Sequence, residues 1–423
     1  MKNKKAKLLI LLFLVCLLAY FTNDFQLINI EKTAIIVALG IDKTQDDKLE
    51  VTAQIALPQA TNQSTSNSDA VLYATDNTLF GALEKISLET GWYPKLTFCN
   101  LILLGNELVK SDFMPIVDYI LTSNRFQNSA IIATTEKSAK ETLMSATPLD
   151  HISSFALQKI LLRNLDRSSS VLVSDVREFT AFSRSHSEFC YAPLITTIQT
   201  QDKQKGSSNQ QSGSSNQSQK GGNRGKITPI ASGEGSGSSD SQSQSSSKQS
   251  EQAVFDASKT LIFSKGKIAC EFTKEQTHCF NLLTKNVRES FIPIKIEREG
   301  KQINALISIV SNKPNIKLSV NNGIANLEVN LTLVCEKEET YSHEKVTELA
   351  KANKVSPEGL KELEKVISGH IVQLIDVSIE SNCDFLQLKE LLYRHNSKYY
   401  YELKDSLLSR LNYNVTVNCK NYR

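Results

Sequence analysis

The sequence predicts an α+β protein of several domains, in which mixed β-sheets carry packed helices, preceded by one N-terminal membrane segment. Three observations predict this class. Short β-branched runs alternate with helical periodicities on both sides of a long polar segment. The chain has 423 residues, which suits two or three domains. A single long uncharged apolar run stands near the start, directly after a cluster of lysines.

The apolar run, residues 8–21, decides on which side of a membrane the rest of the chain works. As a helix it would span about 21 Å, short of the ~30 Å of a hydrocarbon core, but the preceding lysines can reach the headgroups. We therefore favour an uncleaved anchor at 1–24, with a cleaved signal peptide or a lipoprotein signal as alternatives. Because the lysines precede the run, residues 25–423 are expected outside the cytoplasm.

Cys16 lies inside this run and is a candidate site of lipidation. The enzymes that attach a lipid to cysteine favour a small residue just before it, whereas Val15 is bulky. A cleaved signal peptide would need a small-x-small pattern, which the run lacks. Both observations favour a retained anchor.

Composition limits the classes of partner. The net charge is +3 and comes largely from the lysines before the apolar run, so the remainder is nearly neutral and no nucleic-acid partner is expected. The eight cysteines form no C-x-x-C pair, so a zinc site is not expected. Most of them stand where a small apolar residue fits, which predicts buried free thiols. One or two disulfides are the alternative.

Residues 200–252 divide the chain. They are almost entirely Ser, Gln, Gly, Asn and Lys, without an aromatic residue, so they bury too little to offset the entropy of ordering. We expect a disordered linker or a long loop. Its GGNRGK stretch departs from a phosphate-binding loop at Lys220 and Ile227. The folded parts are then an N-terminal domain at 25–199 and a C-terminal domain at 253–423.

The N-terminal block alternates strands and helices. Its expected elements are a strand at 33–41, a hairpin connection DKTQDDK, a strand at 50–57, a helix from Leu79, a strand at 96–104, a helix at 113–121 and a strand at 129–134. Ser138 and Glu141 have the spacing of a capping box, so a further helix is expected to begin there.

The C-terminal block contains two hairpins and a long helix. The hairpins turn at 265–266 and at 322–323, and the second is an Asn-Gly turn. Thr273 and Gln276 are spaced as a capping box before KEQTHCFNLL. The Ser-Pro pair at 356–357 begins the long helix, and the alternation in YNVTVNC predicts a last strand.

No combination of residues predicts an active site, so we expect neither an enzyme nor a cofactor. The six histidines lack metal-ligand spacing; they are His151, His186, His278, His343, His370 and His395. His278 and Cys279 are neighbours and point about 100° apart on a helix, which predicts a partly buried histidine beside a core cysteine. The acidic pairs, such as 46–47, lie in turns or at strand ends and are interpreted as solvated charge.

Two clusters could form surfaces for binding. Arg177, Arg184 and His186 in REFTAFSRSH could bind an anion, although a helix end with exposed charges is the favoured interpretation. The three tyrosines at 399–401 could form a contact surface or pack the final helix on its sheet. The protein is therefore expected to work through its surfaces.

Four segments, in order and spacing, carry a resemblance to a known family. The first two are EKTAIIVALGIDKTQDDKLEVTAQIALPQA, in which the second strand ends near Pro58, and KLTFCNLILLGNELVKSDFMPIVDYILTSNRFQNSAIIATTEKSAKETL, with a helix around 114–121. The last two are KTLIFSKGKIACEFTKEQTHCFNLL and ESNCDFLQLKELLYRHNSKYYYELKD, which includes Asp384 and Phe385. Together they resemble the Ger(x)C spore germination proteins, the C subunits of germinant receptors.

The resemblance implies a three-domain extracytoplasmic protein, attached at the outer face of the inner spore membrane and without known catalytic residues. It implies two polytopic membrane subunits of the receptor as partners. Family members usually carry a lipobox ending Gly-Cys, followed by Trp-Asp. Here Val15, Cys16 and Leu17 replace it, which counts against lipidation but not against membrane attachment.

The expected function is that of a non-catalytic, membrane-attached subunit that supports nutrient-triggered spore germination through protein–protein contacts. One alternative is a tethered extracytoplasmic protein that itself captures a solute or a wall fragment. An enzyme acting on the cell wall is a third reading, which would need a cleft with catalytic groups. Whether a small-molecule germinant binds this chain directly stays open.

Overall fold

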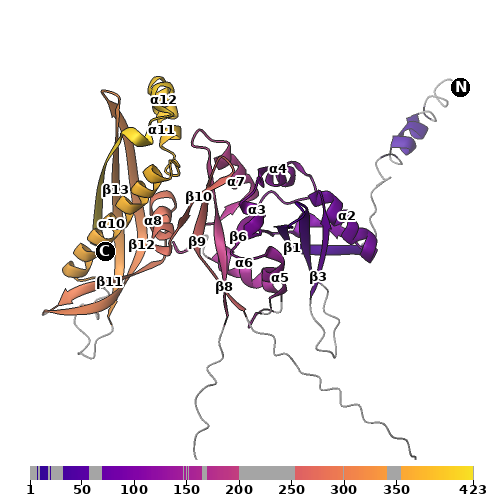
Figure 1. The fold of residues 1–423 in the computed structure, drawn as a ribbon, viewed down its shortest axis with the longest axis horizontal. Helices are drawn as coiled ribbons and strands as arrows, with labels where there is room; N and C mark the ends of the chain where they lie inside the picture. Colours follow the sequence, from indigo (N-terminus) through magenta and orange to yellow (C-terminus); the bar gives the residue numbers. More distant parts are fainter. Residues whose placement is uncertain are drawn as a thin grey trace, which may run out of the picture.

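The computed structural model describes residues 7, 10–17, 20, 32–56, 69–145, 147–148, 150, 152–163, 169–199, 253–298, 300–340 and 354–422. These residues form two β-sheets with packed helices (Figure 1). The predicted α+β class with mixed sheets is confirmed. The expected linker at 200–252 lies outside the described residues.

The first sheet has ten strands in both parallel and antiparallel pairs. Its main path runs β10-β9-β8-β6-β5-β1-β2-β3, with β4 beside β1 and β7 beside β6. The bounds are β1 Thr33–Lys43, β2 Leu49–Ala56, β3 Asp69–Asp76, β4 Tyr93–Lys95, β5 Leu101–Leu104, β6 Ile131–Thr135, β7 Ser174–Asp175, β8 Phe189–Gln199, β9 Ala253–Ser264 and β10 Lys267–Phe272. Because β9 pairs with β8, this sheet takes strands from both sides of residues 200–252.

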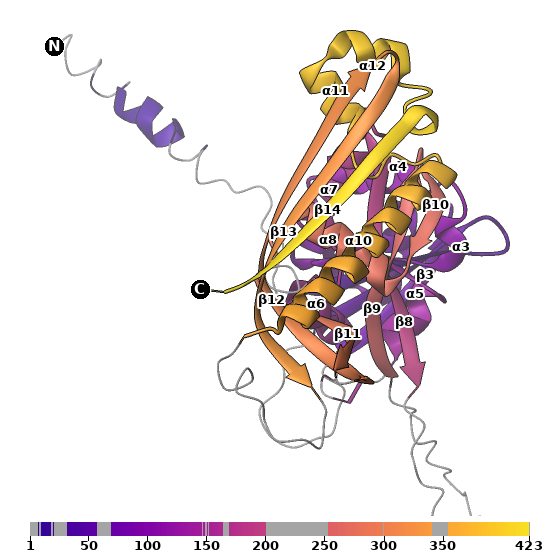
Figure 2. The same ribbon diagram turned by 90° about the vertical axis from the view of Figure 1, so that its left-hand side faces the viewer.

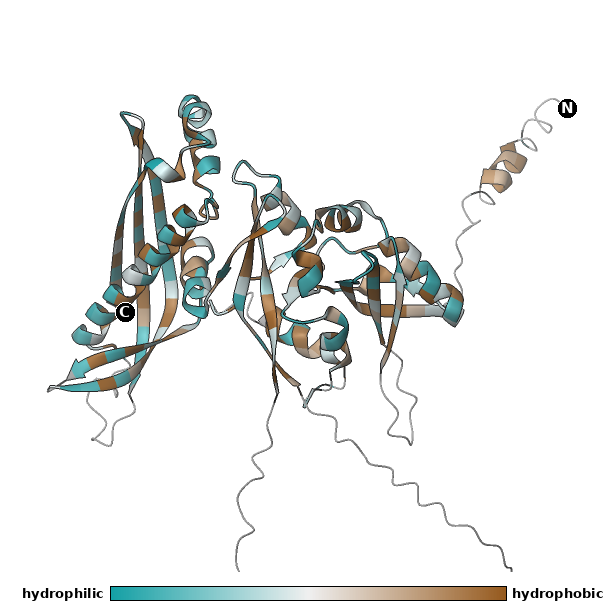
Figure 3. Ribbon diagram, in the orientation of Figure 1, coloured by the Kyte–Doolittle hydropathy of each residue, from teal (hydrophilic) through white to brown (hydrophobic). Residues whose placement is uncertain are grey.

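Helices cover both faces of the first sheet. Apolar side chains of α2 (Leu79–Thr90), α3 (Asn106–Val109), α4 (Met114–Thr122) and α7 (Val176–Ser183) share one core. Those of α5 (Ala139–Met144) and α6 (Ser153–Arg163) share another. Apolar bands therefore follow the strands in Figure 3, since central strands are buried on two sides.

The second sheet has the order β11-β12-β13-β14, and its last strand is parallel to β13. Its bounds are β11 Ser290–Arg298, β12 Lys301–Asn321, β13 Ile324–Thr340 and β14 Leu411–Asn421. The helices of this part are α8 Lys274–Thr284, α10 Pro357–Glu380, α11 Leu388–His395 and α12 Ser397–Leu403. The long α10 lies along the sheet (Figure 2).

One hydrophobic core joins the two sheets. It contains Tyr191 of β8 and Ile262 of β9 together with Leu333 of β13 and Ile371 of α10. The helical spacing of residues 360, 363, 367, 371 and 374 in the sequence predicts one apolar stripe on this helix. The stripe is confirmed, because residues 363, 367, 371 and 374 are buried there and Leu360 is half-buried against the same core.

Local signals predicted several elements correctly. The hairpins β9–β10 and β12–β13 turn at 265–266 and 322–323, where both residues of each pair have positive φ. Thr273 and Gln276 make both hydrogen bonds of the predicted capping box. The strand predicted at 96–104 is partly wrong. Its first residues form the 3-10 turn Leu96–Phe98, closed by the Cys99 N–H bonding to Leu96 O, and only Leu101–Leu104 is extended.

The N-terminal segment is only partly described. Residues 10–17 are helical with exposed side chains. Within the described part of the chain, no helix combines the length and the apolar character that a membrane crossing needs.

Asp42, in the Gly-Ile-Asp-Lys stretch at the end of β1, ties this strand to α5. Its carboxylate accepts hydrogen bonds from the Ala139 N–H at 2.8 Å, the Lys140 N–H at 2.9 Å and the Ser138 hydroxyl at 3.0 Å. Asp42 thus satisfies amide groups that a helix N-terminus leaves without an intrahelical partner. Burial raises the pKa of Asp42, although these hydrogen bonds lower it.

We expect Gly105→Ala to lower the free energy of unfolding by about 1–3 kcal/mol. Gly105 has an ordinary φ of −69°, so the cost is steric. A Cβ there would overlap Asp42 Oδ1, which is already held by α5. Gly369→Ala is the matched control, because its Cβ meets nothing within 4 Å on α10, and alanine favours a helix. Equal denaturant midpoints for the two variants would contradict the tight contact.

Candidate functional site

A buried carboxylate joins the first sheet to the C-terminal helices. Asp384 Oδ2 accepts the Ser187 hydroxyl at 2.6 Å and the Lys389 N–H at 2.7 Å, while Oδ1 accepts the Leu388 N–H at 2.8 Å. Burial raises the pKa of Asp384 to about 6, and these hydrogen bonds offset part of the effect. We call the contact between residues 184–188 and residues 383–400 the junction.

His186 is the second polar element of the junction. Its Nδ1 lies 2.8 Å from Glu390 Oε2. Its ring stacks on Tyr393, with centroids 3.9 Å apart, and meets the edge of Tyr400 at 5.1 Å. Burial alone would raise the pKa of Glu390, but hydrogen bonds from His186 and Arg394 hold it below the usual value. The cluster is therefore a packed contact between distant segments.

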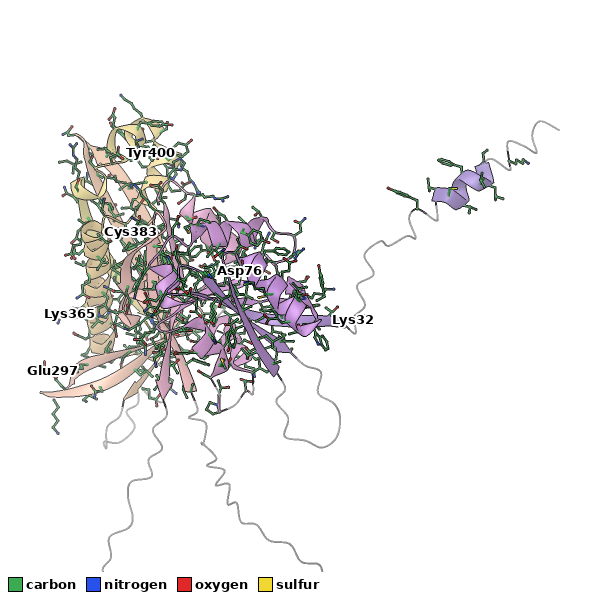
Figure 4. All side chains as sticks on the ribbon, turned by 45° about the vertical axis from the view of Figure 1, so that its right-hand side comes forward. Lys32, Asp76, Glu297, Lys365, Cys383 and Tyr400 are labelled. Atoms are coloured by element: carbon green, nitrogen blue, oxygen red, sulfur yellow. The ribbon has the colours of Figure 1, made fainter. Side chains whose placement is uncertain are left out.

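Phe385 supplies the apolar part of the junction. It is fully buried, and its ring lies 4.9 Å from that of Phe272 and 6.1 Å from that of Phe280. Cys383, two residues earlier, is also buried, and burial raises the pKa of that thiol to about 12. Figure 4 labels its place in the C-terminal part. The junction thus combines aromatic packing with one satisfied buried charge.

A second polar cluster surrounds His278. The Ser169 hydroxyl lies 2.8 Å from His278 Nε2 and 2.8 Å from the Ser290 hydroxyl, which is itself 2.7 Å from Nε2. Burial lowers the pKa of His278 to about 4, so the ring is neutral at pH 7. Both hydroxyls are buried, whereas a nucleophile must be reached by its substrate. We interpret the cluster as a structural contact, in which hydrogen bonds link α8, β11 and the segment before β7.

The three residues that could have bound an anion are not brought together. Arg177 pairs with Asp175 at 3.3 Å, Arg184 pairs with Asp118 at 2.6 Å, and His186 turns to the junction. This agrees with the favoured interpretation of a helix end with charged side chains. Of the three tyrosines at 399–401, Tyr400 belongs to the junction and Tyr401 is exposed.

The cysteines and histidines form no evident reactive site in the described part of the chain. All eight cysteines are free thiols, and five of them are buried; the prediction of buried free thiols is confirmed for these five. No group of three or more His, Cys, Asp or Glu residues there could hold a metal ion. Cys16 is exposed, and its lipidation stays a prediction. His151 and His343 lie outside the described residues.

Sequence reasoning missed the partners that form these clusters. The sequence indicates Asp384 only through the family resemblance, and no motif indicates Ser169, Ser187 or Ser290. Asp384 accepts from the first two amide groups of α11, but it lies three residues before the N-cap position Gln387, so the usual N-cap signal does not indicate it. No local signal indicates that Ser187 would reach it.

Two family models match the chain. "Spore germination protein N-terminal domain" matches residues 27–200, and "Spore germination B3/GerAC like, C-terminal" matches residues 258–421. The structure is similar to the crystal structure of the GerBC protein, with a TM-score of 0.50 and 13% identity, over 91% of this chain and 97% of that chain. That similarity concerns the fold. No curated protein matches the sequence.

Proposed function

The chain belongs to the GerAC-like family of spore germination proteins, and from this premise we propose that it is the non-catalytic C subunit of a spore germinant receptor. The observation that carries the proposal is the pair of family matches, which follow one another over residues 27–200 and 258–421. We propose that the subunit supports nutrient-triggered germination through protein–protein contacts.

The proposal includes attachment to the inner spore membrane, with the folded parts on its outer face. The lysines before the apolar run support that orientation. Two polytopic receptor subunits are the proposed partners. We keep 1–24 as the attachment segment, 25–199 and 253–423 as the proposed domains, and 200–252 as the proposed linker.

The contacts of the junction and of His278 support a scaffold. Their polar groups are hydrogen-bonded to other elements of the same chain. These clusters therefore support the packing of the two sheets rather than the binding of a substrate. A scaffold acts on its partners through its outer surface. The alternative is a tethered protein that captures a solute or a wall fragment, and such a protein would work without the receptor subunits.

We expect the affinity-tagged chain, extracted with mild detergent from spore inner membranes, to co-purify with two polytopic receptor subunits. We also expect spores that lack the chain to lose their response to at least one nutrient. Recovery of the chain without such subunits, together with normal germination of the deleted spores, would contradict the proposal. If the chain co-purifies with two such subunits but spores that lack it germinate normally, only the role in signalling would be contradicted.

The intact mass of the same purified chain tests the attachment. A full-length mass is the expected result for a retained anchor. Loss of residues 1–15 with a diacylglycerol added would show lipidation at Cys16. Loss of residues 1–22 without lipid would mean release from the membrane, and would favour the solute-binding alternative.

A further inference from the structure

The tip of the β12–β13 hairpin contains a pair of residues that can react with each other. Asn322-Gly323 is the only Asn-Gly sequence in the chain. The strand pairing ends at Asn321 and Ile324, so this pair forms the whole two-residue turn. Both residues have positive φ, 53° for Asn322 and 76° for Gly323, as a type I′ turn requires. Turn geometry therefore favours Asn and Gly here, and it places a side-chain amide directly before a glycine.

The two reacting groups are the side-chain amide of Asn322 and the main-chain nitrogen of Gly323. When this nitrogen gives up its proton, it can attack Cγ of Asn322 and close a five-membered succinimide ring. The proton and the amide NH2 leave together as ammonia. Water then opens the ring at either carbonyl, which gives aspartate or isoaspartate at position 322. Water is the only co-reactant, and nothing is oxidised or reduced.

The structure leaves both groups open to this reaction. Asn322 is exposed, so water and hydroxide reach its side chain. A Cβ added at Gly323 would meet nothing within 4 Å, so no group beyond its chain neighbours crowds the main-chain nitrogen. The Gly323 N–H also lies outside the strand pairing, which ends at Asn321 and Ile324. Ring closure therefore does not require the hairpin to unfold.

Asn382 shows that a positive φ alone does not create such a site. It has a φ of 50° and precedes a small residue, Cys383. However, the Cys383 N–H donates a hydrogen bond to Ser378 O at 3.1 Å, and Cys383 is fully buried. Because this nitrogen is bonded and shielded from water, Asn382 is expected to stay intact. It provides a control within the same chain.

We propose that Asn322 is a site of spontaneous deamidation in the folded protein, with isoaspartate among the products. The inference does not depend on the membrane attachment or on the receptor partners. Aspartate can occupy the first position of the same turn. Isoaspartate adds a methylene group to the main chain and does not fit the two-residue geometry. The modification thus adds a negative charge and loosens the tip of the hairpin.

The modification acts at the end of the second sheet where the C-terminal helices lie. Ala325, two residues after Gly323, pairs with Leu411 at the start of β14. Figure 1 shows the hairpin tip at the same end of the molecule as α11 and α12. The pairing of β12 with β13 extends from the tip back to Ala305 and Thr340, so the rest of the hairpin is expected to stay folded. Deamidation therefore changes one exposed end of the sheet without unfolding it.

Incubation of the purified full chain in detergent, at neutral and at mildly alkaline pH, tests the proposal. Trypsin cleaves after Lys317 and Lys337, so the turn is recovered in one peptide, residues 318–337. We expect this peptide to lose the Asn322 amide progressively, and faster at the higher pH because the attacking nitrogen must give up its proton. We also expect it to become a substrate for a methyltransferase specific for isoaspartate. The peptide that contains Asn382 is expected to remain unchanged.

Two variants connect the change to ring closure. Asn322→Gln keeps an amide but would have to close a six-membered ring, and Gly323→Ala places a methyl group beside the attacking nitrogen. Both are expected to lower the rate severalfold, and Asn322→Gln is the main control because alanine is strained at a φ of 76°. Conversion at Asn322 in the urea-unfolded chain but not in the folded chain would overturn the proposal, since the turn would then hold the two groups apart. Equal rates in the parent chain and in Asn322→Gln would overturn it as well.

Discussion

Phe385→Ala is expected to lower the free energy of unfolding by about 3–5 kcal/mol, as is typical for a fully buried phenylalanine. The ring stands edge-on to Phe272 at the end of β10 and to Phe280 of α8. Truncation would leave a cavity between the first sheet, α8 and the segment that follows α10. Denaturant unfolding of the purified chain measures the loss.

Two variants make this result specific to the junction. Tyr401→Ala removes an exposed ring on α12 and is expected to change the free energy of unfolding by less than about 0.5 kcal/mol. Phe385→Leu keeps most of the volume and should recover a large part of the loss. If Phe385→Ala were as stable as Tyr401→Ala, this result would contradict the burial of Phe385 between Phe272 and Phe280.

The same variant also bears on function. The junction connects residues 383–400 to the first sheet, so truncation of Phe385 would loosen the packing of this segment on the part that begins at the N-terminal run. Receptor subunits that contact both parts would then be recruited less well. We expect reduced co-purification with Phe385→Ala and normal co-purification with Tyr401→Ala.

The elements predicted well were those encoded by neighbouring residues. The turns at 265–266 and 322–323, the capping box at Thr273 and the apolar stripe of α10 all follow from spacings within a few residues. Such signals are local because turn geometry and helical period depend on adjacent backbone angles. The fold class followed from the alternation of these elements.

The parts that sequence reasoning did not find depend on residues far apart in the chain. The pairing of β8 with β9 crosses residues 200–252, and Ser187 meets Asp384 across nearly two hundred positions. No periodicity within a segment encodes which distant hydroxyl satisfies a buried carboxylate. The strand predicted at 96–104 shows the same limit, because β1 fixes its backbone: the Asn100 N–H bonds to Val37 O.

The pH dependence of stability is expected to differ between the parent chain and Asp384→Asn. Burial raises the pKa of Asp384 from 3.8 to about 6, so the native state binds this proton more tightly than the unfolded chain does. Its contribution to stability is fully present below pH 3.8 and is lost as the pH rises through about 6. Asparagine does not titrate, so the substitution itself changes the free energy of unfolding by the same amount at every pH.

Relative to Asp384→Asn, the parent chain is therefore expected to lose about 2–2.5 kcal/mol between pH 4 and pH 7, since one pKa unit corresponds to about 1.4 kcal/mol and part of the effect lies below pH 4. Denaturant midpoints at the two pH values measure the difference. Ser187→Ala provides a second test, because removal of the donor at 2.6 Å leaves the carboxylate less stabilised and shifts the transition to higher pH. Parallel pH curves for all three proteins would show that Asp384 stays in contact with water, and that Ser187 does not hold it inside a closed junction.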